Sequence, residues 1–100
     1  MTTWHITSQL PPDEPNEANL AAYSQPQLMA GASPDGRYIF DVVYDHNSPC
    51  FVLTLLEIND LLGFVENETR RYPTSREQLL RMIADFQAAP AASFGNKSAA

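Results

Sequence analysis

The segment SPDGRYIFDVVYD, residues 33–45, decides the fold class that this sequence predicts. It opens with Ser33-Pro34-Asp35-Gly36, which predicts a tight turn, because proline presets the second turn position and glycine accepts a positive φ angle. Residues 37–45 predict a strand, because their side chains alternate between two faces. One face holds Tyr38, Phe40, Val42 and Tyr44, and the wetter face holds Arg37, Ile39, Asp41, Val43 and Asp45. We therefore expect a hairpin that buries one face of its sheet.

The neighbouring segments extend this hairpin. Residues 27–32 lead into the first turn, and a second turn over residues 46–49 returns the chain into residues 50–53. These ranges predict a three-stranded antiparallel meander, which a short strand over residues 3–7 can join as a fourth. The prolines of residues 9–15 prevent regular structure, and residues 16–24 predict a short N-terminal helix.

Two further helices are predicted after the meander, each by a capping box in which a threonine is followed three residues later by a glutamate. Thr54 with Glu57 begins the first, and Thr74 with Glu77 begins the second. Apolar residues recur at helical spacing behind each box, and the apolar stripe of the first helix consists of Leu55, Ile58, Leu61, Leu62 and Val65. Tyr72-Pro73 separates the two helices.

The fold predicted from these elements is α+β. It has a three- to four-stranded antiparallel meander, two C-terminal helices packed on one face, and a short N-terminal helix. Residues 1–87 are expected to form a single domain. Residues 88–100 are rich in alanine, serine, proline and glycine, so we expect a disordered tail there.

Charge is distributed unevenly along the chain. The formal net charge is −6, but residues 1–68 contain ten acids and one base, whereas residues 69–100 contain two acids and five bases. The acidic excess disfavours general binding to the phosphates of nucleic acids and favours a partner with a basic surface. Net negative charge also keeps a small protein soluble, so the charge alone does not define a function.

The sequence predicts a cytoplasmic location without membrane contact. No apolar run approaches the length of about 18 residues that crosses a bilayer, and the first residues lack the pattern of a signal peptide. The single cysteine, Cys50, forms no internal disulfide, as is typical of a reducing compartment.

No residue pattern predicts catalysis, a metal site or a cofactor. His46 and Cys50 flank a predicted turn, but structural zinc needs four ligands, and a cysteine nucleophile needs a base and an oxyanion hole. The carboxylates of Asp41 and Asp45 need a pocket that perturbs them before they can do acid–base work. We therefore expect a non-enzymatic protein. The alternative is a small enzyme subunit whose site forms only on oligomerisation, and a homodimer is compatible with the sequence.

The candidate partner-binding surface lies on the first predicted helix, outside its apolar stripe. Its residues fall within about a quarter turn at about 100° per residue, and they are Glu57, Asp60, Phe64 and Glu68. Phe64 is expected to fill a pocket while the acids attract arginines or lysines, as inhibitors, immunity proteins, antitoxins and nucleic-acid mimics do. The expected partner is a protein with a basic surface, such as a nucleic-acid-binding protein. Asp41 and Asp45 extend the surface if they lie on its side. The alternative is that the sheet or the N-terminal segment covers Phe64 and makes it part of the core.

A second candidate is an anion or nucleic-acid contact at the start of the last predicted helix. Its residues are Arg70, Arg71, Thr74 and Arg76. Free backbone amides at a helix N-terminus and arginine side chains together suit a phosphate or carboxylate. The alternative is that these arginines balance the acidic half of the chain or point into solvent.

Overall fold

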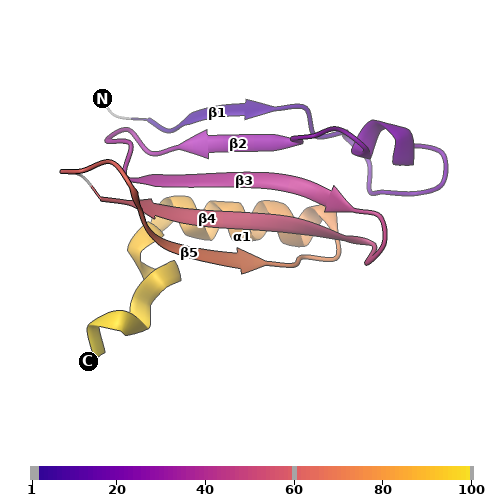
Figure 1. Cartoon of the computed structure of the whole chain (residues 1–100). Coiled ribbons are helices and arrows are strands. Elements are labelled where there is room, and N and C mark those ends of the chain that lie inside the picture. The colour runs from indigo at the N-terminus through magenta and orange to yellow at the C-terminus, as the bar shows by residue number, and fades with distance from the viewer. Residues whose placement is uncertain (1–2, 60, 100) are drawn as a thin grey trace.

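The computed structural model describes residues 3–59 and 61–99 and shows an α+β fold. Five strands form one antiparallel sheet in which the spatial order equals the chain order (Figure 1). The strands are β1 (His5–Ser8), β2 (Met29–Ala32), β3 (Tyr38–Asp45), β4 (Cys50–Ile58) and β5 (Val65–Arg71). The α-helix α1 (Arg76–Ala88) packs on one face, and the 3-10 helices are η1 (Leu20–Tyr23) and η2 (Pro90–Ala99). The predicted class and the antiparallel meander are confirmed, but the sheet has five strands instead of the predicted three or four.

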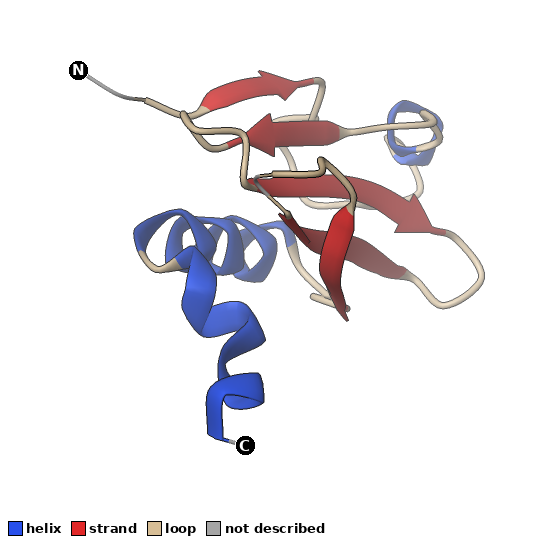
Figure 2. Cartoon of the chain, turned by 60° about the vertical axis from the view of Figure 1, so that its left-hand side comes forward, coloured by secondary structure: helices blue, strands red, loops and turns tan. Residues whose placement is uncertain are grey.

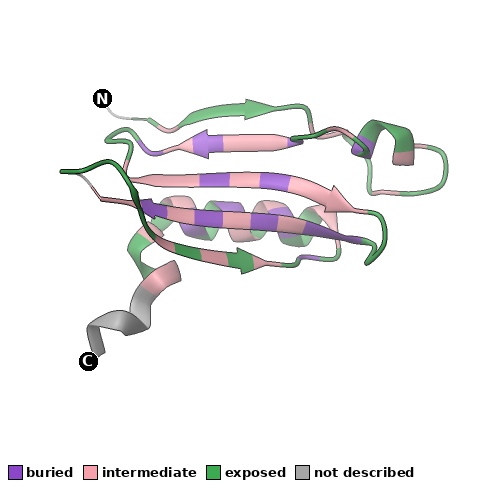
Figure 3. Ribbon diagram, in the orientation of Figure 1, coloured by how far each residue is buried: buried purple, intermediate pink, exposed green. Residues whose placement is uncertain are grey.

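The core lies between α1 and the face of the sheet that it covers (Figure 2). Phe40 pairs with Leu55 and Val42 with Leu53, and these four side chains are buried towards the helix. The helix contributes Leu79, Ile83 and Phe86. Burial alternates along β3 and β4 (Figure 3), which confirms the predicted two-faced strand of residues 37–45. We call the face opposite α1 the open face.

The turn predicted before β3 is present. The N–H of Gly36 donates to the carbonyl of Ser33 at 2.9 Å, and Gly36 has a φ of 74°, which other residues rarely adopt. Asp35 Oδ1 accepts hydrogen bonds from Ser33 Oγ (2.6 Å) and from the N–H of Arg37 (3.0 Å). These bonds hold the entry to β3.

The predicted helix behind Thr54 is wrong, because this segment continues β4 and turns into β5. Residues 50–58 are apolar at almost every position, so they satisfy a strand as well as a helix, and pairing with β3 decides between the two. Thr54 lies in the middle of β4, and Glu57 lies towards α1 and pairs with Asn67 of β5. Gly63, with a φ of 78°, makes the turn between the strands.

The last predicted helix is confirmed as α1, with its cap one residue later than expected. Ser75 is the N-cap, and its side chain accepts a hydrogen bond from the N–H of Gln78 at 3.0 Å. The Gln78 side chain in turn accepts a hydrogen bond from the N–H of Thr74 at 2.9 Å. Ser75 and Gln78 thus occupy the N-cap and N3 positions of a capping box, except that Gln78 binds the N–H of the residue before the N-cap.

The predicted N-terminal helix over residues 16–24 is wrong. The segment forms only the single 3-10 turn η1. The side chain of Asn16 accepts hydrogen bonds from the N–H groups of Ala18 (2.8 Å) and Asn19 (3.1 Å), so local side-chain bonds replace helical ones at its start. Tyr23, at the end of η1, is fully buried and anchors the segment on the core.

The C-terminal segment follows α1 directly. Disorder of residues 88–100 stays a prediction, although the structure places Phe94 against Tyr38 and Phe86, with ring centroids 6.3 Å and 6.2 Å away. Among the described residues, no helix is long and apolar enough to span a membrane.

Candidate functional site

The turn between β4 and β5 exposes four large apolar side chains, and we call residues 61–65 the hairpin tip. The exposed fractions are 90% for Leu61, 75% for Leu62, 50% for Phe64 and 49% for Val65. Single exposed apolar residues are common on proteins, but a cluster of them marks an interaction surface. The tip is therefore the strongest candidate site on the described surface.

Hydrogen bonds from Asn59 hold the backbone of the tip. Its side chain accepts bonds from the N–H groups of Leu61 (2.9 Å) and Leu62 (2.8 Å). Its own N–H donates to the carbonyl of Phe64 at 2.8 Å, and its carbonyl accepts a bond from Gly63 at 2.9 Å. The two leucines thus project from a turn of defined shape, so little conformational entropy opposes their burial by a partner.

Carboxylates flank the tip on β5. Glu66 and Glu68 are both exposed, and Glu68 forms an ion pair of 2.9 Å with Arg70. Asp60, predicted as part of the partner-binding surface, lies outside the described residues. Phe64 and Glu68 both lie in this hairpin, but Phe64 is in the tip and Glu68 is in β5, so the single helix face on which they were predicted to lie is absent.

Glu57 does not belong to this surface. It is 6% exposed and faces the helix side of the sheet. Its carboxylate accepts hydrogen bonds from Asn67 Nδ2 (2.6 Å) and Tyr38 Oη (3.3 Å), and Arg37 Nη2 lies 3.8 Å away. Buried carboxylates need such partners, so the role that this geometry supports for Glu57 is to join β3, β4 and β5.

Asp41 and Asp45 lie on the open face of β3, away from the tip. Asp41 is in register with Thr54 of β4 and accepts a hydrogen bond from Gln27 Nε2 at 2.6 Å. Asp45 Oδ1 accepts bonds from the N–H groups of Asn47 (2.9 Å) and Ser48 (3.4 Å), which shapes the β3–β4 turn at the opposite end of β4. They share a face, as predicted, but do not extend the tip.

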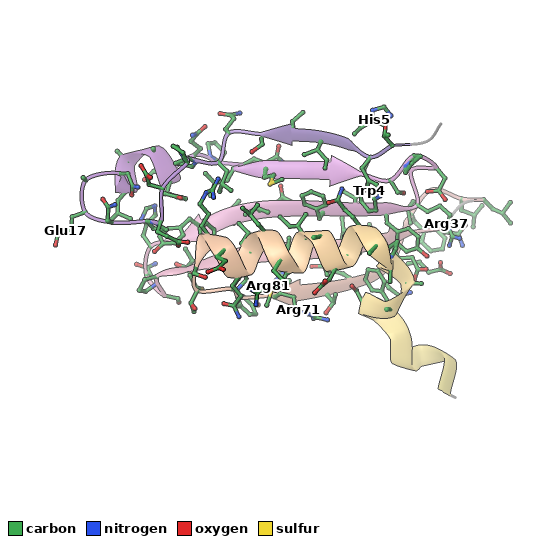
Figure 4. The ribbon with its side chains drawn as sticks, turned by 180° about the vertical axis from the view of Figure 1, so that it is seen from behind. Trp4, His5, Glu17, Arg37, Arg71 and Arg81 are labelled. Atoms are coloured by element: carbon green, nitrogen blue, oxygen red, sulfur yellow. The ribbon has the colours of Figure 1, made fainter. Side chains whose placement is uncertain are left out.

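The arginines of the anion candidate are not brought together. Arg70 and Arg71 are consecutive in β5, so their side chains lie on opposite faces, and Arg71 reaches towards α1 (Figure 4). At the start of α1, the carboxylate of Glu14 already accepts the N–H groups of Arg76 (2.7 Å) and Glu77 (3.1 Å). Arg76 Nε donates to the carbonyl of Pro11 at 2.8 Å. The anion contact stays a prediction.

His46 and Cys50 do not form a catalytic or metal pair in the geometry. The Nε2 atom of His46 lies 3.1 Å from Ser24 Oγ, and its ring packs on Tyr44, whereas Cys50 is buried in β4. Within residues 3–59 and 61–99, no group of three histidine, cysteine or acidic side chains is placed to hold a metal ion.

Two clefts of about 430 Å³ lie on the helix side of the sheet. One lies between α1, η2 and the sheet and brings Arg71 near Asp85 above Leu53 and Leu55. The other lies beside Trp4 and the Ser33–Asp35 turn. Apart from Arg71, neither contains a residue that the sequence predicted for a site.

Sequence reasoning missed Leu61, Leu62 and Val65 as surface residues, because it assigned them to the buried stripe of a helix. The signal that could have found them was Asn59 followed by Gly63, since asparagine and glycine four positions apart suit a turn between two strands. The comparisons with protein-family models, with curated proteins and with solved structures find no match for this chain.

Proposed function

We propose that this chain is a non-enzymatic binding protein that inserts its hairpin tip into an apolar pocket on a partner protein with a basic surface. The observation that carries the proposal is the exposure of Leu61 and Leu62, at 90% and 75%, on a turn that Asn59 holds in shape. Exposed leucines on a shaped turn suit insertion better than the flat contact of a helix face.

Burial of the tip side chains supplies enough free energy for a specific complex. Full burial of a leucine or phenylalanine contributes about 1.5–3 kcal/mol each, so Leu61, Leu62 and Phe64 supply the anchor of a specific complex. Glu66 and Glu68 beside the tip, within a chain of net charge −6, attract a basic rim and raise the association rate. A nucleic-acid-binding protein of the cytoplasm fits this description of the partner.

Site-specific cross-linking tests the proposal while the partner is still unidentified. A photoreactive phenylalanine analogue replaces Leu62 in one variant and Asn47, in the turn at the other end of β4, in a control. Both residues are exposed. We expect a discrete cross-linked protein with a basic surface from the Leu62 variant alone in native cells. Identical products from both positions, or none from Leu62, contradict the proposal.

Matched variants then test the two parts of the contact on the captured partner. The double variant Leu61→Ser/Leu62→Ser is expected to raise Kd by about 100-fold through faster dissociation. Glu66→Lys is expected to slow association, most strongly at low salt, whereas Glu17→Lys makes the same charge change at an exposed site on another part of the chain. If the two lysine variants slow association equally, the net charge of the chain alone explains the effect. That result contradicts a specific role for the carboxylates beside the tip.

A further inference from the structure

The outer edge of β5 carries a further inference. Hydrogen bonds show which residues of β4 face which neighbour: the N–H of Phe51 donates to the carbonyl of Pro73 (2.8 Å), and the N–H of Ile58 donates to the carbonyl of Arg37 (2.7 Å). Because backbone groups alternate in direction along an antiparallel strand, the odd-numbered residues of β4 bond to β5 and the even-numbered ones to β3.

The same alternation fixes the groups at the edge of β5. Leu53 pairs with Arg71 and Leu55 with Thr69, so the odd-numbered residues of β5 direct their backbone groups towards β4. The N–H and C=O groups of Glu68 and Arg70 therefore point away from the sheet, where the carbonyl of Arg70 accepts a hydrogen bond of 3.3 Å from Arg71 Nη1, a bond that a second strand would replace. Such an edge is a template for another strand.

The regular part of β5 has a defined centre. A register shift opposite Glu57 and Ile58 ends regular pairing at Asn67, and β5 ends at Arg71, before Tyr72-Pro73. The regular segment is residues 67–71, and its middle residue is Thr69. A second copy that pairs antiparallel with the whole segment places a two-fold axis at Thr69.

We propose that two copies of this chain associate through β5, antiparallel, about a two-fold axis at Thr69. In this register Glu68 of each copy lies directly opposite Arg70 of the other, on the open face, and Asn67 lies opposite Arg71. Both side chains of the Glu68–Arg70 pair are about half exposed in the single chain, so they are accessible to the second copy. Opposite charges directly across a strand pair stabilise it.

The charge pattern selects the same register as the strand geometry. Charged side chains usually protect an edge strand from pairing, because they repel their copies. An axis on Glu68 places that carboxylate opposite its own copy, and an axis on Arg70 does the same for two guanidinium groups. The axis at Thr69 avoids both like-charge pairs.

Exposed apolar residues at the two ends of β5 also meet in this arrangement. Tyr72 is 58% exposed and Val65 is 49% exposed. Val65 begins β5 and Tyr72 follows its last residue, so antiparallel pairing brings the Val65 end of one copy next to the Tyr72 end of the other. The dimer thus covers apolar surface at both ends of the strand in addition to its backbone groups.

The dimer has a functional consequence. The two-fold axis is perpendicular to the sheet, so both α1 helices lie on the same side and the two hairpin tips point in opposite directions. A dimer then presents two tips, and a partner with two pockets binds with an increased effective concentration.

Charge-exchange variants test the dimer by sedimentation equilibrium of the whole chain over a wide concentration range. Glu68→Arg and Arg70→Glu each create two like-charge pairs and are expected to raise the dimer Kd by about tenfold or more. An equimolar mixture of the two variants, and the double variant Glu68→Arg/Arg70→Glu, are expected to restore association. The double variant also retains the ion pair within one chain, so it controls for folding.

Hydrogen exchange tests the position of the pairing. The amides of Glu68 and Arg70 are expected to exchange more slowly as the protein concentration rises, whereas those of Asn67, Thr69 and Arg71 stay protected throughout by β4. A monomer at every concentration, or a dimer that neither single variant weakens, overturns the proposal. The variant Leu61→Ser/Leu62→Ser is expected to remain dimeric, and Arg70→Glu keeps the tip intact, so failure of the dimer and failure of the tip are distinguishable.

Discussion

Glu14 and Arg76, which are 62 positions apart, are joined by a hydrogen bond of 2.7 Å from the backbone N–H of Arg76 to Glu14 Oε1. The other carboxylate oxygen accepts the N–H of Glu77 at 3.1 Å, and Arg76 Nε donates to the carbonyl of Pro11. A carboxylate at a helix N-terminus satisfies orphaned amides and opposes the positive end of the helix dipole. Residues 9–15, which we call the strap, are thereby fastened to α1.

Glu14→Gln is expected to lower the free energy of unfolding by about 1–2 kcal/mol, because the amide removes the charge-assisted bonds to the helix amides. Denaturant unfolding measures the change. Glu17→Gln is the matched control, since its side chain is exposed and points away from the sheet (Figure 4). If the two variants have equal stability, the carboxylate of Glu14 does not stabilise α1.

Gly31→Ala is expected to destabilise the fold by about 1–3 kcal/mol through overpacking. A Cβ atom added at Gly31 would clash with Cε2 of Phe40, whose side chain is fully buried across the β2–β3 pair. The coupling is measured by thermal unfolding of Gly31→Ala, of Phe40→Leu and of the double variant. We expect the double variant to lose less stability than the two single variants lose in total. Strictly additive losses contradict a clash between these residues.

Glu57→Ala is expected to lower the free energy of unfolding by about 1–3 kcal/mol, because it leaves Asn67 and Tyr38 without a hydrogen-bond acceptor that they use. Glu66→Ala removes a carboxylate from the exposed flank and is expected to change stability by less than about 0.5 kcal/mol. Chemical denaturation of both variants makes the comparison. A Glu57 variant as stable as the Glu66 variant contradicts the structural role of Glu57.

The stability contributed by Asp35 is expected to depend on pH. The hydrogen bond from Ser33, and then that from the N–H of Arg37, hold the pKa of Asp35 below its ordinary value of 3.8. The folded state therefore binds fewer protons than the unfolded state near this pH. The stability that the Asp35 carboxylate contributes is thus present above pH 3.8 and is lost as the pH falls through the pKa of the folded state. The stability difference between the wild type and Asp35→Asn is expected to shrink below that pH; a constant difference contradicts this account.

The part of the fold that was predictable rests on local signals. Residues 33–45 contain both a turn and a clean alternation, and residues 74–86 contain a cap followed by helical spacing. The helix predicted from Thr54 failed because cross-strand pairing outweighed a pattern that suits either structure. β5 was missed because an edge strand with exposed side chains needs no apolar alternation.

The candidate site was only partly predictable for the same reason. Helical spacing predicts Phe64 and Glu68 as neighbours on one face, whereas the hairpin places Phe64 in the tip and Glu68 in β5, and Glu57 is buried on the side of α1. The contact of Glu14 with the start of α1 joins segments 62 positions apart. No local pattern encodes such a contact, because it depends on how the finished sheet places its ends.

The strap also bears on the order in which the chain folds. Each strand pairs with its neighbour in sequence, so the meander can grow by successive hairpins, whereas the bonds of Glu14 and Pro11 to α1 close loops of more than 60 residues. Contacts that close long loops form late, because closing the loop costs conformational entropy, and the contacts that offset this cost exist only once the sheet and the helix have assembled. Fastening of the strap is then expected to be a late step of folding and its release an early step of unfolding. Loss of Glu14 should accordingly accelerate unfolding and leave the folding rate unchanged.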